Sequence, residues 1–310
     1  MVHLHYLSSA VALAKAEPAS IEGVEPIERV RVRAREGDAE VERSDSLSVE
    51  EPLEIRVRGQ EGAARSFVTT MRTPGSDEEL AAGLLFAEGV LAGRSDLVAL
   101  ERPADPRLSP ELRANGLVAT LSPEALARAG GLTRGTVMGS ACGVCGKTSI
   151  ESVLPEGAAP LESPLSVSAE ILYGLPDRLR ERQSVFAETG GLHAAALFDG
   201  NGNLLSARED IGRHNATDKL VGSFFLEGKL PLSDAMLLVS GRAGFEIVQK
   251  AFGAGIPIVC SVSAPSSLAV ELAESAGLTL VGFLRARRCN VYSHPRRIQS
   301  SEKDAVLKSP

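Results

Sequence analysis

Two cysteines spaced three positions apart are the residues of this sequence whose type and spacing are best suited to chemistry. Cys142 and Cys145 lie in residues 139–146, GSACGVCG, inside a glycine-rich stretch that begins at Gly130. A thiolate can act as a nucleophile or bind a metal ion, and two thiols can exchange with a disulfide. Because repeated glycines favour a mobile, exposed loop, the sequence predicts a thiol pair on a flexible segment.

Zinc chemistry fits the rest of the sequence poorly. A structural zinc ion needs four ligands, and the pair supplies two. Cys260 lies in an apolar run and Cys289 stands alone, and His193, His214 and His294 show no paired spacing. A zinc deaminase has a glutamate two residues after its histidine and a Pro-Cys-x-x-Cys further on, whereas here Ala195 holds the glutamate position and the cysteines come first. We therefore expect no bound metal.

Two thiol functions stay open on spacing alone. A thiol–disulfide exchanger places its cysteine pair at a helix start, where the helix dipole lowers one thiol pKa, and the glycines around this pair disfavour a rigid helix start. A sulfur carrier needs a nucleophilic thiolate on a segment that reaches two partners. In that case Cys145 could help to release the sulfur by forming a disulfide with Cys142.

The elements that would position this chemistry divide into segments along the chain. Composition and patterning predict a disordered tail over residues 1–26 and an N-terminal α+β lobe over 27–129. The glycine-rich loop and a linker follow over 130–164, then a C-terminal α/β domain over 165–298 and a tail over 299–310. In the first lobe, Ser76 and Glu79 have the spacing of a helix capping box.

The C-terminal domain has the more regular pattern. Three apolar strands are predicted at 235–240, 256–262 and 278–284, and their starts are about 22 residues apart, as in tight β-α-β units. Nearly continuous apolar strands between helices indicate parallel strands covered on both faces. We expect a three-layer α/β domain, preceded by a hairpin over 193–208 and by a helical region over 169–188 that Pro176 interrupts.

Three loops meet at one edge of such a sheet. In open α/β sheets the ligand binds beyond the carboxyl ends of the strands, where this chain has residues 240–244 (SGRAG), 263–267 (SAPSS) and 285–288 (RARR). Helix N-termini with arginines nearby suit a phosphate or pyrophosphate. The sequence therefore predicts an anionic ligand held by Gly241, Arg242 and the arginines of the third loop.

Composition excludes several classes of partner. The chain has 310 residues, 33 basic and 40 acidic side chains, a net charge of −7 and only 4% aromatic residues. This balance argues against DNA, and no apolar run is long enough to span a membrane. Four cysteines without a basic leader indicate a cytoplasmic protein. Residues 278–300 nevertheless hold five arginines and no acid, which predicts one basic edge (Arg285, Arg287, Arg288, Arg296 and Arg297).

Six segments in a fixed order resemble one protein family. They are residues 139–146 (GSACGVCG), 189–193 (TGGLH), 208–215 (REDIGRHN), 240–246 (SGRAGFE), 261–267 (SVSAPSS) and 290–295 (NVYSHP). Together they resemble the formate dehydrogenase accessory sulfurtransferase family, FdhD, over about residues 27–298. The resemblance implies a C-terminal domain similar to the cytidine deaminase fold.

The resemblance also implies a function. Such proteins take sulfur from a cysteine desulfurase and pass it to the molybdenum cofactor, bis(molybdopterin guanine dinucleotide), which they bind transiently before its insertion into apo-formate dehydrogenase. Cys142 would carry the persulfide and Cys145 would assist. The stretch matching the cofactor-binding segment is Phe283, Leu284, Arg285, Ala286, Arg287 and Arg288. We expect a homodimer that binds the guanine-nucleotide moiety.

Alternative functions and some residue roles stay open. The protein could be a chaperone that binds the cofactor without sulfur chemistry, or a thiol–disulfide exchanger. His193 and His214 could orient a thiol or bind a phosphate, although we favour a hydrogen-bonded structural role for each. Glu209 and Asp210 could accept the guanine N1 and N2 donors, or pair with Arg208 and Arg213.

Overall fold

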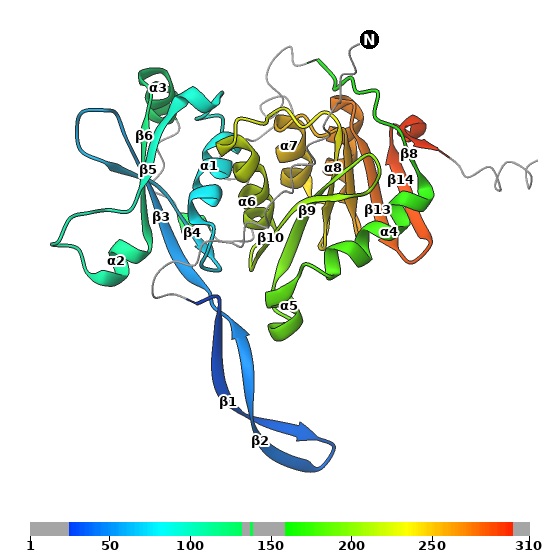
Figure 1. Cartoon of the computed structure of the whole chain (residues 1–310), viewed down its shortest axis with the longest axis horizontal. Coiled ribbons are helices and arrows are strands. Elements are labelled where there is room, and N and C mark those ends of the chain that lie inside the picture. The colour runs from blue at the N-terminus through cyan, green and yellow to red at the C-terminus, as the bar shows by residue number, and fades with distance from the viewer. Residues whose placement is uncertain (1–24, 132–136, 139–158, 300–310) are drawn as a thin grey trace, which may run out of the picture.

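Two sheets lie on either side of a central pair of helices (Figure 1). The computed structural model describes residues 25–131, 137–138 and 159–299. The first sheet has the strand order β5-β6-β3-β4-β7. Its elements are β3 (Glu51–Arg58), β4 (Arg65–Arg72), α1 (Asp77–Ala87), β5 (Leu97–Glu101), α2 (Pro110–Ala114), β6 (Gly116–Leu121), α3 (Pro123–Gly131) and β7 (Val137–Met138).

The second sheet has six strands in the order β10-β9-β11-β12-β13-β14. Its central strands β11, β12 and β13 are parallel, as the apolar runs predict, and antiparallel strands flank them. The elements of this half of the chain are β8 (Val167–Ser168), α4 (Ala169–Arg180), α5 (Ser184–Thr189), β9 (His193–Asp199), β10 (Leu204–Asp210), α6 (Arg213–Leu226), β11 (Ala235–Val239), α7 (Phe245–Gly253), β12 (Ile258–Ser261), α8 (Ser267–Ala276), β13 (Thr279–Arg285), β14 (Arg288–Ser293) and β15 (Ile298–Gln299). Of these, β8 and β15 pair with each other in a separate two-stranded parallel sheet.

Apolar side chains cover both faces of the six-stranded sheet. One cluster packs Leu237 and Val259 against α6, α7 and α8, and another packs Met236 and Ile258 against α4. This confirms the α/β class and the layered arrangement of the C-terminal domain. The likeness to the cytidine deaminase fold and the predicted segment boundaries stay predictions.

The predicted capping box at the start of α1 is wrong. Ser76 has a left-handed backbone conformation, with φ of 55°, and its side chain makes no capping hydrogen bond. Glu79 instead binds Arg208 of β10, with Oε2 to Nε and Oε1 to Nη2 distances of 2.5 and 2.6 Å. Glu79 therefore forms an ion pair with a residue distant in the sequence, where the local pattern predicts a hydrogen bond at the start of its own helix.

Other elements also differ from the predictions. Pro176 does not interrupt its helix, since α4 continues to Arg180 and the break comes at residues 181–183. The strand β14 was not expected, so residues 285–288 form the turn of a β-hairpin rather than a free loop. The sequence also gave no clear indication of the short helix α2. None of the helices in the described part is long and apolar enough to cross a membrane.

Helices α1 and α6 cross at very close range between the two sheets (Figure 1). A Cβ atom on Gly83 would lie 2.0 Å from the carbonyl oxygen of Asp218, and one on Gly222 would lie 1.8 Å from that of Glu79. Nearby, the rings of Phe86 and Phe225 pack with their centroids 5.5 Å apart. The two lobes therefore share an apolar interface that requires glycine on both helices.

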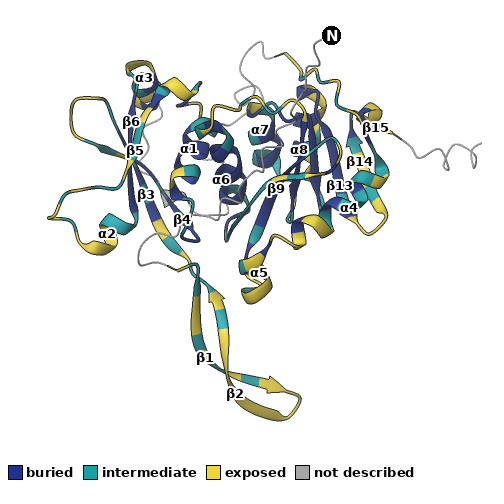
Figure 2. Ribbon diagram, in the orientation of Figure 1, coloured by how far each residue is buried: buried dark blue, intermediate teal, exposed yellow. Residues whose placement is uncertain are grey.

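A two-stranded hairpin projects from this body (Figure 1). It consists of β1 (Ile27–Glu36) and β2 (Ala39–Ser48), paired antiparallel along their whole length. None of its residues is buried, as the exposure colouring of Figure 2 shows. We call residues 27–48 the arm.

The close helix crossing predicts a large and local effect on stability. Gly83→Ala would force α1 and α6 apart, and we expect a loss of about 3 kcal/mol or more in the free energy of unfolding, measured by urea denaturation. Gly174→Ala is the matched control, because Gly174 lies within α4 and a Cβ there would meet nothing within 4 Å. That variant should be unchanged or gain up to about 1 kcal/mol. Equal losses in both variants would contradict the interpretation.

Candidate functional site

The three loops predicted to converge do lie side by side at the carboxyl edge of the six-stranded sheet. Main-chain hydrogen bonds connect them in sequence across the edge. Ser240 N donates to Ala194 O at 2.9 Å, Val262 N to Val239 O at 3.2 Å, and Phe283 N to Ser263 O at 3.0 Å. The start of β9, the loop after β11, the loop after β12 and the end of β13 therefore form one continuous rim.

A pocket of about 560 Å³ opens at this rim. A cavity of this size is in the range that holds a small ligand or a single nucleotide. Helices α4 and α5 form one wall and the rim forms the other. The polar or charged lining groups are Asp177, Arg180, Gln183, His193 and Ser240, and the apolar ones include Leu179, Phe186 and Val262.

Two of the glycine-containing motifs shape the pocket wall. Gly190 ends α5 with a left-handed φ of 68°, which favours glycine. A Cβ on Gly191 would lie 2.7 Å from Ser48 Oγ at the base of the arm. A Cβ on Gly241 would lie 3.2 Å from His193 Nδ1. Residues 189–193 and 240–244 thus pack together and place the His193 ring at the pocket.

Glu209 holds α5 in position. Its two carboxylate oxygens accept hydrogen bonds from Val185 N and Phe186 N, at 3.1 and 2.9 Å, in the first turn of α5. Burial raises the pKa of Glu209 in spite of these bonds. Because both carboxylate oxygens of Glu209 bind the first turn of α5, the structure gives no support to the predicted contact between Glu209 and guanine.

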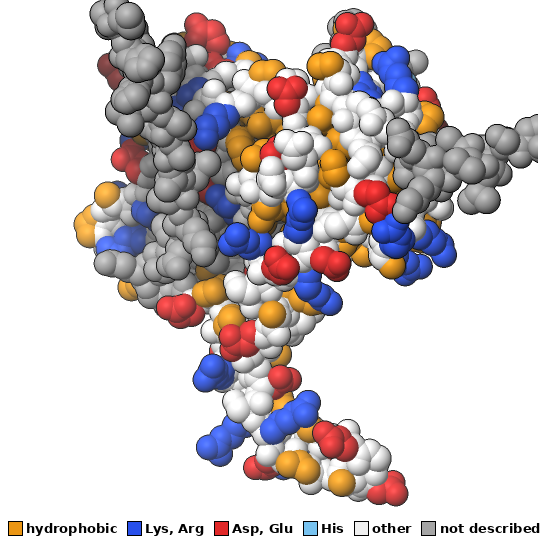
Figure 3. Space-filling model, turned by 45° about the vertical axis from the view of Figure 1, so that its right-hand side comes forward, with side chains coloured by type: hydrophobic (Ala, Val, Ile, Leu, Met, Phe, Trp, Pro, Cys, Tyr) orange, Lys and Arg blue, Asp and Glu red, His pale blue; other side chains and the backbone are white. Residues whose placement is uncertain are grey.

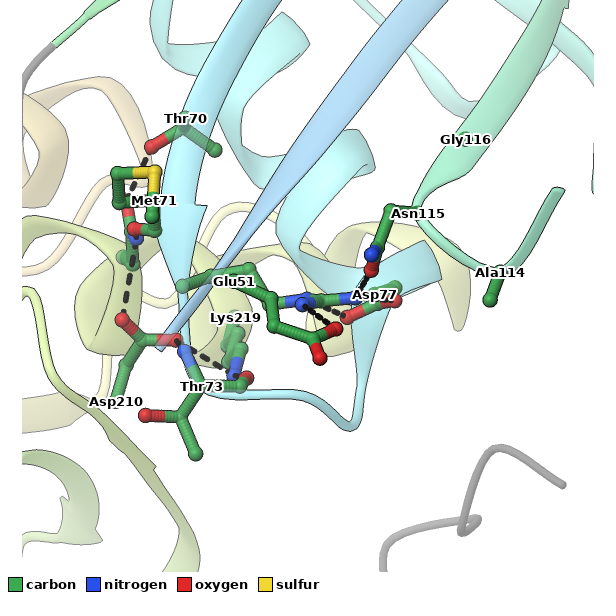
Figure 4. A network of polar contacts seen from close by, with 12 residues as sticks. Glu51, Thr70, Met71, Thr73, Asp77, Ala114, Asn115, Gly116, Asp210 and Lys219 are labelled. Carbon is green, nitrogen blue, oxygen red and sulfur yellow. Dashed lines mark hydrogen bonds and ion pairs between the residues drawn. The ribbon is translucent and has the colours of Figure 1, made fainter. Parts of the chain in front are cut away.

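Asp210 is the centre of a buried polar network at the junction of the two lobes (Figure 4). Its Oδ2 accepts from Lys219 Nζ at 2.7 Å and from Thr73 N at 3.2 Å. Its Oδ1 accepts from Gly212 N at 2.8 Å and from Asn215 Nδ2 at 3.1 Å. With no exposed surface and both oxygens bound, Asp210 cannot contact guanine, and that hypothesis is wrong.

The network continues along β4. Asn215 Nδ2 also donates to Met71 O at 2.7 Å, and Lys219 Nζ donates to Thr73 O at 2.8 Å. The adjacent Arg72, which is fully buried, forms a two-point ion pair with Asp77 at 2.9 and 3.0 Å. Burial raises the pKa of Asp77, but its bonds to Arg72 and Arg102 outweigh this and hold it below its usual value.

His193 and His214 both lie close to the positive charge of Arg213. Burial and the charge of Arg213 lower the pKa of His193. Burial, Arg213 and Lys250 lower the pKa of His214 to about 3, so this ring is neutral at physiological pH. Among the described residues, the buried Nε of Arg213 has no hydrogen-bond acceptor. Its Cδ lies 3.8 Å from the Cβ position of Gly241, which places Arg213 beside the pocket rim.

The predicted basic edge is smaller than the sequence suggested. Arg242, Arg285 and Arg288 are exposed. Arg287 is exposed as well but forms an ion pair with Glu170 of α4, and its guanidinium carbon lies 5.6 Å from the centroid of the Tyr173 ring. Arg297 does not belong to this edge. It is buried, and its guanidinium donates to the carbonyl oxygens of Gly277 and Leu161.

The hairpin that carries these arginines has an irregular backbone. Phe283 and Ala286 both have left-handed φ values, of 52° and 51°, and the pairing of β13 with β14 shifts register between Gly282 and Arg285. Such a conformation costs a non-glycine residue about 1–3 kcal/mol and often occurs where a protein binds a ligand. Leu284 is buried in the apolar core, and this packing anchors the hairpin to the sheet.

The cysteines fall into two groups. Cys142 and Cys145 lie outside the described residues, so their predicted roles stay predictions. Cys260 is buried in β12, and burial raises its thiol pKa strongly. Cys289 is half-buried, packs against the same apolar cluster and also has a raised thiol pKa. Both fit the packing role predicted for them.

Comparison with known proteins decides the family. The model of the FdhD/NarQ family matches residues 48–299, which include all six sequence motifs and the whole pocket. The chain belongs to the FdhD/NarQ family. A relative from Mycobacterium tuberculosis, named sulfur carrier protein FdhD, is 48% identical over 86% of this chain and 97% of its own length.

Other relatives extend the family assignment across distant organisms. A protein from Saccharolobus solfataricus with the same name is 43% identical over 86% of this chain and 96% of its own length. Among solved structures, a protein from Desulfotalea psychrophila named as a formate dehydrogenase accessory protein has a TM-score of 0.68 at 23% identity. It matches 89% of this chain and all of its own. This last similarity supports the fold of this family member.

Sequence reasoning missed several residues of the family member's pocket. Arg180 lines the pocket and its guanidinium carbon lies 4.8 Å from the centroid of the Phe186 ring. Gln183, in the break between α4 and α5, is almost fully buried. Neither lies in a motif, and only the packing of α4 against the rim brings them there. The hypothesis that Arg208 pairs with Glu209 or Asp210 is also wrong, because Arg208 binds Glu79.

The buried network predicts a strong effect of removing one partner. Asp210→Ala would leave the Lys219 ammonium buried without a counter-charge, and we expect a loss of about 3–5 kcal/mol in the free energy of unfolding, measured with urea. As a control, Asp105→Ala removes the exposed partner of Arg107 and should leave stability unchanged. If Asp210→Ala unfolds at the same urea concentration as the parent protein, the network does not hold the lobes together.

Proposed function

We propose that this protein is a sulfur carrier that accepts sulfur on Cys142 from a cysteine desulfurase and transfers it to the molybdenum cofactor destined for formate dehydrogenase. The observation that carries the proposal is the ordered set of motifs, from the cysteine pair to the arginine hairpin, within one family match. Relatives named as sulfur carriers at 48% and 43% identity support it.

The first step is a transfer between thiols. The Cys142 thiolate attacks the outer sulfur of the desulfurase persulfide, forms a new S–S bond and displaces the desulfurase cysteine as a thiolate. Cys142 then carries the sulfur as a persulfide. When Cys145 attacks the inner sulfur, the two cysteines form a disulfide and the outer sulfur leaves as sulfide, which the cofactor accepts. A small-molecule thiol reduces the disulfide and returns the pair to its starting state.

The rim is the proposed site for the guanine-nucleotide part of the cofactor. The pocket volume suits one nucleotide. The pyrophosphate is anionic, and Arg242, Arg285 and Arg288 present exposed guanidinium groups at the rim loops, with Arg213 beside Gly241. His193 and Gln183 also line the pocket, and burial together with the charge of Arg213 lowers the pKa of His193 and so disfavours a charge on its ring. Since Arg287 is already paired with Glu170, we assign it to the support of the hairpin.

Sulfur transfer is tested by mass. Incubation of the protein with a cysteine desulfurase and cysteine should add one sulfur atom to Cys142, located by mass spectrometry of peptides. Cys142→Ala should abolish the added mass, and Cys289→Ser should retain it because that thiol is a packing residue. Sulfur found on Cys289 would contradict the assignment. If Cys142→Ala still activates formate dehydrogenase, the protein is a chaperone without sulfur chemistry, and turnover of a model disulfide would indicate an exchanger.

Nucleotide binding is tested with GDP as the probe. Replacing Arg285 and Arg288 by glutamate should weaken GDP binding by about tenfold or more in a calorimetric titration, with a larger difference at low salt because the charges are exposed. Arg296→Glu is the matched control, since Arg296 is exposed and follows the other end of the hairpin. An unchanged affinity in the double variant, or an equal loss in the control, would overturn the assignment.

A further inference from the structure

Neither acid of the motif at residues 208–215 is free to bind the base of the proposed nucleotide. Guanine presents N–H donors at N1 and N2 and an acceptor at O6 along its pairing edge. The sequence predicts Glu209 and Asp210 as acceptors for those donors, but contacts within the protein occupy both carboxylates. An acceptor for the base must therefore come from another part of the pocket.

One wall of the pocket carries three polar side chains at intervals of three residues. Asp177 and Arg180 lie on α4, Gln183 lies in the break after it, and all three line the pocket. Because residues three apart lie on the same face of a helix, this face of α4 is turned towards the pocket. Asp177 is the single acidic side chain among the described residues that line the pocket.

Gln183 is buried, yet the fold does not use its side chain. Gln183 is 5% exposed, and although it holds the N-cap position of α5, its side chain makes no capping hydrogen bond. Within the described part of the chain, only its main-chain groups are bonded, to Arg180 and Ala187. A buried polar group without a partner is unfavourable. An amide of this kind in a pocket wall indicates a hydrogen bond to a ligand.

Phe186 and Arg180 form a flat surface at the same wall. The guanidinium carbon of Arg180 lies 4.8 Å from the centroid of the Phe186 ring, and both side chains line the pocket. Aromatic rings and guanidinium planes both stack on nucleobases. The apolar side chains of Leu179 and Val262 line the same space. This wall therefore suits a flat aromatic ring with a polar edge.

The opposite wall has the chemistry that phosphate requires. The rim loops present the exposed Arg242, Arg285 and Arg288. Figure 3 shows basic side chains gathered at the right of the body, where the β13–β14 hairpin turns. Guanidinium groups bind phosphate oxygens, whereas the carboxylate of Asp177 would repel them. The two walls therefore orient a nucleotide with its base on α4 and α5 and its phosphates on the rim.

We propose that Asp177 and Gln183 recognise guanine, with the base stacked on Arg180 and Phe186. The Asp177 carboxylate accepts hydrogen bonds from N1 and N2 of the base, and the Gln183 amide donates one to O6. The carboxylate selects the base, because adenine has an acceptor at N1 and no amino group at position 2. An amide alone does not discriminate, since it both donates and accepts. The role of both residues rests on the proposed nucleotide site.

Calorimetric titrations with GDP, IDP and ADP test the role of Asp177. IDP differs from GDP only in lacking the amino group at position 2. The parent protein should bind GDP about tenfold more tightly than IDP, because IDP loses a hydrogen bond to a charged acceptor, and should bind ADP more weakly still. Asp177→Ala should weaken GDP binding by about tenfold and bring the affinities for GDP and IDP to within about twofold of each other.

Glu181→Ala is the matched control for Asp177→Ala. Glu181 is an exposed acid at the end of α4 that does not line the pocket, so its removal takes the same charge from the same helix. The control should leave both affinities within about twofold of the parent protein, because an exposed charge is screened by solvent and salt. A parent protein that binds GDP and IDP equally overturns the proposal. So does an Asp177→Ala variant that keeps the preference for GDP, or an equal loss in the control.

Gln183→Met separates a ligand-binding role from a structural one. The amide has no partner in the described part of the chain, so the variant should unfold at the same urea concentration as the parent protein or at a higher one. Its affinities for GDP and IDP should both fall by about fivefold or more, because both nucleotides carry O6. A loss of stability with an unchanged affinity for GDP would show a structural role and overturn the assignment.

GDP binding by the parent protein separates a failure of base recognition from a failure of the proposed function. If the parent protein does not bind GDP, the nucleotide site and its base recognition are both wrong. If it binds GDP through Arg285 and Arg288, and neither Asp177→Ala nor Gln183→Met changes the titrations, base recognition by these residues alone is wrong. Sulfur loading of Cys142 is a separate measurement that depends on neither result.

Discussion

The buried contact between Asp210 and Lys219 is the interaction on which the rest of the structure depends. An ammonium and a carboxylate taken out of water are tolerated only when the remaining hydrogen-bonding positions are filled, and here main-chain and side-chain groups of β4 and the start of α6 fill them. Those groups come from both lobes. The network therefore fixes the angle between the lobes as well as the position of the turn between β10 and α6.

That turn connects the network to the pocket. Asp210, Gly212 and Arg213 follow one another within four positions, so the network sets where α6 begins and where Arg213 points. Glu209, one residue before Asp210, faces the opposite way and binds the start of α5. Residues 208–215 thus position the helices beside the rim. Its charged residues hold the fold around the rim, and the rim loops and arginines are left to contact a ligand.

Much of the fold could be predicted from the sequence because the signals were local. The parallel strands β11, β12 and β13 have unbroken apolar residues, and the carboxyl edge that collects the loops follows from their direction. The failures came where tertiary contacts decided the outcome. Glu79 pairs with Arg208 and does not cap its own helix, and Arg297 is buried in the core. Arg180 and Gln183 line the pocket because helix packing places them there. The strands of the arm show only a weak alternation, because neither of their faces is buried within the chain.

The shortness of α5 has a consequence for how the protein folds. A helix of six residues is far below the length at which a helix forms by itself in water, because nucleation is unfavourable. Its supporting contacts come from Glu209, more than twenty positions later, and from Ser48, about 140 positions earlier. Contacts that close such long loops form late in folding. We therefore expect the pocket wall to be among the last parts to order, so a ligand in the pocket would bind only the completed fold and stabilise all of it.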